Sequence, residues 1–183
     1  MALALFERPR RIKVMKFEVG LDFLKIPQEH FHPLLVHFPI ALWSCAFIFF
    51  ILSFSGKLRK LEFPACVMGL AGSVFGFLAM KAGEKSVEIL GDQICQLQLL
   101  ESHESNAETA FIFYTGSFVL LAVIMMTRTY VLKRSLPILL NIIPAFGMLL
   151  GGAYLVKAGH QGYQLVFMHG VGVSKDPPQC QAN

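Results

Sequence analysis

Histidine is the residue type in this sequence with the greatest capacity for chemistry. The chain of 183 residues contains six histidines, and an imidazole binds iron, copper or zinc and exchanges protons near neutral pH. They are His30, His32, His37, His103, His160 and His169. The four cysteines include no Cys-x-x-Cys pair, so the sequence has neither a zinc-finger signature nor a site for covalent c-type haem attachment.

The composition places these histidines in a membrane protein. Hydrophobic residues make up 55% of the chain and charged residues 15%, against roughly 25% charged in an average soluble domain. The mean hydropathy is +0.57. The formal net charge of +4 is small and gives no indication of nucleic-acid binding. We therefore expect one small domain whose main partner is membrane lipid.

Four segments are long and apolar enough to span a bilayer, at about 20 residues for each span. They are residues 33–54, 64–80, 107–126 and 136–156. Backbone polar groups in lipid need partners within their own segment, so we predict an all-α integral membrane four-helix bundle. The expected organisation is an N-terminal tail with an amphipathic segment at 1–31, a four-span membrane domain at 32–173 and a C-terminal tail at 174–183.

The charges of the connections predict an orientation. The short connections at residues 55–63 and 127–135 together carry six basic residues and one acid. Short basic loops favour the cytoplasm, which places both termini and a loop at 81–106 on the outer side. The basic group Arg10, Arg11, Lys13 and Lys16 in the N-terminal tail opposes this orientation. We expect a multi-pass protein of the inner (plasma) membrane with a periplasmic histidine face.

Threading the chain through four spans brings all six histidines to one membrane face. His37 lies about 6–8 Å inside the first predicted span, where each nitrogen of a neutral imidazole needs a partner. His103 and His160 reach the same depth from the third and fourth spans, so these three histidines can meet in one polar layer. His32 and His169 lie farther toward the surface, and His30 is expected only to form hydrogen bonds at headgroup level.

Glycines recur at spacings of about four residues in the second and fourth spans. They are Gly69, Gly72, Gly76, Gly147, Gly151 and Gly152. This pattern is typical of close packing between membrane helices, and it also leaves room for a flat macrocycle in the bundle.

The cysteines divide between the spans and the histidine face. Cys45 and Cys66 fall inside predicted spans and are expected to behave as small buried apolar residues. Cys95 and Cys180 both lie on the histidine face, which is the oxidising side in the expected orientation. We therefore predict a Cys95–Cys180 disulfide.

Two motifs mark the ends of the predicted membrane domain. Residues 32–39 read HPLLVHFP, and residues 165–173 read LVFMHGVGV. They resemble the HPxxVHFP and LVxxHGVGV patterns at the two ends of a bacterial family of predicted membrane proteins, domain of unknown function 2231. His103 stands where the family has a histidine at the entry to the third span. Tyr163 and Phe167 depart from the closing pattern, which has Gly and Tyr there.

The resemblance covers about residues 32–173 and implies a four-span fold. Some members of the family are joined to Rieske or cytochrome c modules, which suggests electron transfer. The candidate cofactor-binding residues that carry over are His32, His37, His103, His160 and His169.

The leading hypothesis is a membrane-embedded electron-transfer subunit that binds haem b, with His37, His103 and His160 as candidates for iron. Its expected partner is a larger redox complex or an outer cytochrome c or Rieske-type protein. The alternative is a non-redox membrane anchor or scaffold subunit. An ion transporter is less favoured because the spans carry almost no charged residues, and no hydrolase motif is present. Whether the chain is itself an enzyme stays open.

Overall fold

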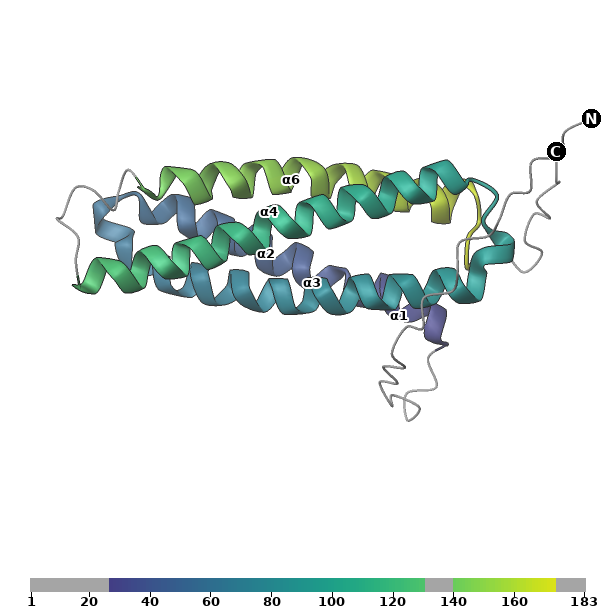
Figure 1. The fold of residues 1–183 in the computed structure, drawn as a ribbon, viewed down its shortest axis with the longest axis horizontal. Coiled ribbons are helices and arrows are strands. Elements are labelled where there is room, and N and C mark those ends of the chain that lie inside the picture. Colours follow the sequence, from purple (N-terminus) through teal and green to yellow (C-terminus); the bar gives the residue numbers. More distant parts are fainter. Residues whose placement is uncertain (1–26, 131–139, 174–183) are drawn as a thin grey trace, which may run out of the picture.

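A computed structural model describes residues 27–130 and 140–173, and within this part of the chain the structure is helical with no strands (Figure 1). Four long helices alternate in direction along the bundle. They are α2 (His37–Ser53), α3 (Glu62–Leu90), α4 (Leu97–Tyr130) and α6 (Ile142–Tyr163). Short elements are the helix α1 (Phe31–Leu35), the 3₁₀ turns η2 (Gln28–His30), η3 (Gly56–Leu61) and η4 (Gly91–Gln93), and the π-helical turn η5 (Gln164–Met168).

The four long helices, with their adjoining turns, are long and apolar enough to cross a membrane. The candidate spans are Gln28–Ser53, Gly56–Leu90, Leu97–Arg128 and Ile142–Met168. Large apolar side chains such as Ile48, Val74 and Leu149 are exposed on the outside of the bundle, an arrangement that suits contact with lipid rather than water. The predicted all-α four-helix membrane bundle is confirmed.

The helices extend beyond the predicted spans at the histidine end. Helix α3 continues to Leu90 and α4 begins at Leu97, so the loop expected at 81–106 is reduced to a short connection. Lys81 and Lys85 form ion pairs with Glu84 and Glu88, each three residues ahead, a spacing that suits an exposed helix. The start expected at residue 136 for the fourth span lies outside the described residues, and that span continues past residue 156 to Met168.

Aromatic side chains packed on glycines form the core. A Cβ atom at Gly72 would lie 2.7 Å from the Trp43 ring, and one at Gly151 would lie 2.9 Å from the Tyr114 ring. The two rings stack on each other with centroids 4.6 Å apart and an interplanar angle of 7°. The glycines therefore let two aromatic rings meet at the centre of the bundle.

The bundle consists of two helical hairpins of the same design, α2–α3 and α4–α6. His103 and Tyr114 stand 71 residues after His32 and Trp43, and Asn141 stands 79 residues after Glu62. Each of these residues contacts its own counterpart, through the ring pairs and a hydrogen bond of 2.8 Å from Asn141 Nδ2 to Glu62 Oε1. Such self-pairing is what a twofold axis along the bundle requires of parallel repeats.

Candidate functional site

His32 is held against the first hairpin's second helix. It extends from α1 toward α3, and its Nδ1 atom lies 2.8 Å from the carbonyl oxygen of Ala79. A Cβ atom at Gly83 would lie 2.9 Å from the same Nδ1 atom. Because Gly83 is one turn after Ala79, its missing side chain leaves that carbonyl open to the imidazole.

His103 repeats this arrangement in the second hairpin. Its Nδ1 atom, extending from α4, lies 2.8 Å from the carbonyl oxygen of Ala158 in α6. A Cβ atom at Gly162 would lie 3.2 Å from its Cε1 atom. The same Ala-x-x-x-Gly spacing thus receives a histidine ring in each hairpin.

The two imidazoles contact each other across the bundle in an edge arrangement. Their ring centroids are 6.2 Å apart and their planes are nearly perpendicular, at 86°. A carbonyl oxygen only accepts hydrogen bonds, so each Nδ1 carries the proton and donates it. In this tautomer each Nε2 keeps a free lone pair, which is the form of histidine that binds a metal.

A polar network beside His103 fastens α4 to α6. Asn106 Nδ2 donates to Gln161 Oε1 at 2.9 Å, and Gln161 Nε2 lies 2.7 Å from Ser102 Oγ. Asn106 Nδ2 also donates to the Ser102 carbonyl at 2.8 Å. Sequence reasoning missed these residues because only the helix pairing brings them together.

The other histidines lie at the same end of the bundle but do not join this pair. His37 is exposed, and its Nδ1 lies 2.7 Å from the Pro33 carbonyl of the preceding turn. His160 is also exposed and stacks on Tyr163 with centroids 6.5 Å apart. His30 is exposed and His169 is half-buried in the turn after η5. Of the three histidines expected to share one layer, only His103 is in the pair, and its partner is His32.

The donor set is limited to two imidazoles. Over residues 27–130 and 140–173, no group of three or more His, Cys, Asp or Glu side chains is placed to hold a metal ion. Structural and catalytic zinc sites use four and three protein ligands respectively. The pair by itself supplies fewer protein ligands than either kind of zinc site uses.

The expected burial of the two span cysteines is confirmed for Cys66 and wrong for Cys45. Both are free, but Cys66 lies in the core and Cys45 is exposed on the outside of α2, because only one side of each helix faces the core. Cys95, after η4 at the histidine end, is disulfide-bonded. Cys180 lies outside the described residues, so the Cys95–Cys180 pairing stays a prediction.

Four apolar helices in one bundle define a multi-pass membrane protein. Residues 28–175 match the family described as "Predicted membrane protein (DUF2231)", and the chain belongs to this family, as the two motifs indicated. A comparison with curated proteins finds no match. A comparison with solved structures finds none either. The family description names no activity, so a function has to be argued from the histidine pair.

Proposed function

We propose that the protein binds haem b at the histidine end, with His32 and His103 as the two axial ligands, and serves as an electron-transfer subunit of the membrane. One observation carries the proposal. Two imidazoles from different hairpins contact each other, and the Nδ1 atom of each is already bonded to a backbone carbonyl.

The separation of the rings supports this assignment. Two imidazoles that bind one metal from opposite sides, through bonds of about 2 Å, have ring centres roughly 6 Å apart. The observed centroid separation is 6.2 Å. The number of ligands also agrees, because a haem supplies four nitrogens and leaves two axial positions for the protein.

The residues around the histidine pair each have a role in the proposed haem site. The Ala79 and Ala158 carbonyls orient the imidazoles and raise their basicity as ligands. Gly83 and Gly162 allow the rings to approach α3 and α6. Bound haem would supply one-electron chemistry. The position at one end of the bundle suits exchange with an outer redox partner such as a cytochrome c or Rieske-type protein.

Spectroscopy of the purified protein tests the proposal. Protein from cells supplied with haem precursor should show a Soret band and about one iron per site, and His32→Ala or His103→Ala should remove the band. His30→Ala and His37→Ala are matched controls, because both histidines are exposed at the same end, and they should keep it.

Two results would contradict the assignment. A Soret band that survives in both His32→Ala and His103→Ala would move the ligands elsewhere, with His37, His160 and His169 the next candidates. Wild-type protein without any Soret band would favour the anchor or scaffold function. Each histidine would then only join the two helices of its own hairpin through its carbonyl bond.

A further inference from the structure

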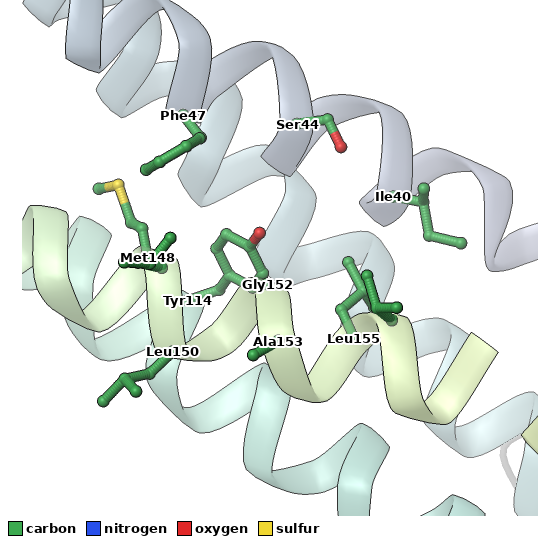
Figure 2. Close-up of a pocket in the computed structure, with 11 residues that line it drawn as sticks. Ile40, Ser44, Phe47, Tyr114, Met148, Leu150, Gly152, Ala153 and Leu155 are labelled. Carbon is green, nitrogen blue, oxygen red and sulfur yellow. The ribbon is translucent and has the colours of Figure 1, made fainter. Parts of the chain in front are cut away.

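A groove opens between α2 and α6, two neighbouring helices that make little direct contact. Its volume is about 700 Å³, within the range of ligand sites for small molecules. Its lining includes Ile40, Ser44, Phe47, Tyr114, Gly152 and Val156 (Figure 2). Ile40 is 41% and Val156 74% exposed, so the groove faces outward, where the hydrocarbon of a membrane would lie.

The repeat makes this opening unexpected. The twofold relation of the hairpins pairs the α2–α6 interface with the α3–α4 interface, where the helices make more contact. The indole of Trp43 donates to the Gly69 carbonyl of α3 at 3.2 Å. No hydrogen bond to the hydroxyl of its counterpart Tyr114 is present among the described residues. The polar atom of one ring is thus satisfied, and that of the other faces the groove.

Tyr114 supplies a hydrogen-bonding group inside an apolar site. Its side chain is nearly enclosed, with 4% of the residue exposed. Figure 2 shows its hydroxyl directed into the space between α2 and α6, where the Ser44 hydroxyl also points. A Cβ atom at Gly152 would lie 3.2 Å from the Tyr114 oxygen, so glycine keeps the hydroxyl accessible. Buried tyrosine hydroxyls usually have a partner, and here the open side is the groove.

The depth of Tyr114 restricts what that partner can be. Tyr114 follows the charged residue Glu108 by six residues, which places it about 9 Å farther along α4 and thus inside the hydrocarbon core. The polar groups of phospholipids stay at the edge of the hydrocarbon core, which is about 30 Å thick. A partner for Tyr114 must therefore carry a hydrogen-bonding headgroup and still dissolve in hydrocarbon.

We propose that the α2–α6 groove binds a quinone with an isoprenoid tail. Its ring packs against Phe47 and Tyr114, a ring carbonyl accepts a hydrogen bond from the Tyr114 hydroxyl, and the tail leaves the open side of the groove into the bilayer. Ser44 offers a second donor to the headgroup. The binding does not rest on haem at the histidine end, because α4 separates His103 and Tyr114 by about 16 Å.

The only tryptophan of the chain reports on this site directly. Trp43 stacks on Tyr114 at 4.6 Å, and quinones quench indole fluorescence. We would reconstitute the full chain in vesicles of quinone-free phosphatidylcholine, which add no other tryptophan, and titrate a short-chain ubiquinone. Quenching should saturate. Tyr114→Phe should weaken the apparent affinity roughly three- to tenfold, the loss of one hydrogen bond, and Gly152→Leu should abolish saturable quenching.

Three comparisons make the test decisive. Tyr163→Phe, at an exposed tyrosine, should bind like wild type, and a hydrocarbon with the same tail but no ring should not compete. Equal quenching of wild type and Tyr114→Phe, or equal competition by the hydrocarbon, would overturn the proposal. So would a dimer in these vesicles that Gly152→Leu dissociates, since a second copy would then fill the groove. If Gly152→Leu does not fold, Tyr114→Phe alone decides.

The outcome is independent of the haem proposal. Protein without a Soret band but with saturable, Tyr114-dependent quenching would keep the quinone site and remove the haem. A Soret band without saturable quenching would keep the haem and remove the quinone site.

Discussion

At the residue scale, helix periodicity explains why His32 and not His37 enters the bundle. The two residues are five positions apart, and at about 100° per residue they point roughly 140° apart on a helical path. Only one of them can face the second hairpin. His32 does so and meets His103, whereas His37 bonds back to the preceding turn and faces outward.

A small residue at position 83 is needed for the His32 bond. Gly83→Val should displace the imidazole, because a Cβ atom there would lie 2.9 Å from Nδ1, and overpacking of this kind costs about 1–3 kcal/mol. We expect a lower thermal midpoint by circular dichroism and, if haem is bound, a shifted Soret band. Gly159→Val is the control, since a Cβ atom at Gly159 meets nothing within 4 Å. Equal midpoints in the two variants would contradict this prediction.

At the element scale, a buried ion pair ties the two hairpins together at one end of the bundle. Opposite the histidines, Arg128 makes two bonds to the Glu62 carboxylate, Nη1 to Oε2 at 2.6 Å and Nη2 to Oε1 at 3.0 Å. Asn141 donates to the same carboxylate. The three residues come from α4, from the start of α3 and from the turn before α6. They hold the ends of both hairpins while the aromatic rings fill the middle.

Removing one partner of this ion pair should destabilise the bundle. The Glu62 and Arg128 side chains are only 6% and 18% exposed, so Arg128→Met leaves a buried, unpaired carboxylate and should cost about 3–5 kcal/mol. The double variant Glu62→Leu/Arg128→Met should recover most of the loss. Unfolding in mixed micelles with increasing dodecyl sulfate measures both effects. A double variant as unstable as Arg128→Met would show that the pair itself, not the unpaired charge, sets the stability.

At the scale of the whole molecule, the helices are longer than the membrane is thick. At about 1.5 Å per residue, α3 is about 44 Å and α4 about 51 Å long, against a hydrocarbon core of about 30 Å. The charged residues of α3 and α4 near their junction, including Lys81, Glu88 and Glu101, fall at the histidine end. We therefore expect that end to lie at or beyond the membrane surface.

The orientation of the bundle is testable with single cysteines. In a background with the native cysteines replaced, Gly91→Cys at the histidine end should react with an impermeant maleimide in spheroplasts. Lys57→Cys at the basic end should react only after lysis, because short basic connections stay in the cytoplasm. Both positions are exposed. The opposite labelling pattern would place the histidine face in the cytoplasm, the side that the basic N-terminal tail favours.

The predicted Cys95–Cys180 disulfide also depends on the orientation of the bundle in the membrane. An oxidising compartment on the histidine side would preserve it. Peptide mapping of non-reduced protein should find Cys95 and Cys180 linked, with Cys45 and Cys66 alkylated as free thiols. Alkylation of Cys95 and Cys180 without prior reduction would contradict the pairing.

The sequence by itself determined the four-span helical fold, because uninterrupted apolar segments of membrane length have no other way to satisfy their backbone in lipid. It also determined that the histidines share one end. Successive spans cross the membrane in opposite directions, so their order along the chain assigns every connection to one face. The offset of 71 residues between His32 and His103, with matching Ala-x-x-x-Gly spacings, was readable in the sequence as a repeat but has meaning only once the hairpins pair. The tertiary structure decided which imidazoles meet. It also decided that the groove is open between α2 and α6, while α3 and α4 pack together. The physical reason is that side-chain direction around a helix and unequal packing between hairpins depend on contacts far apart in the chain.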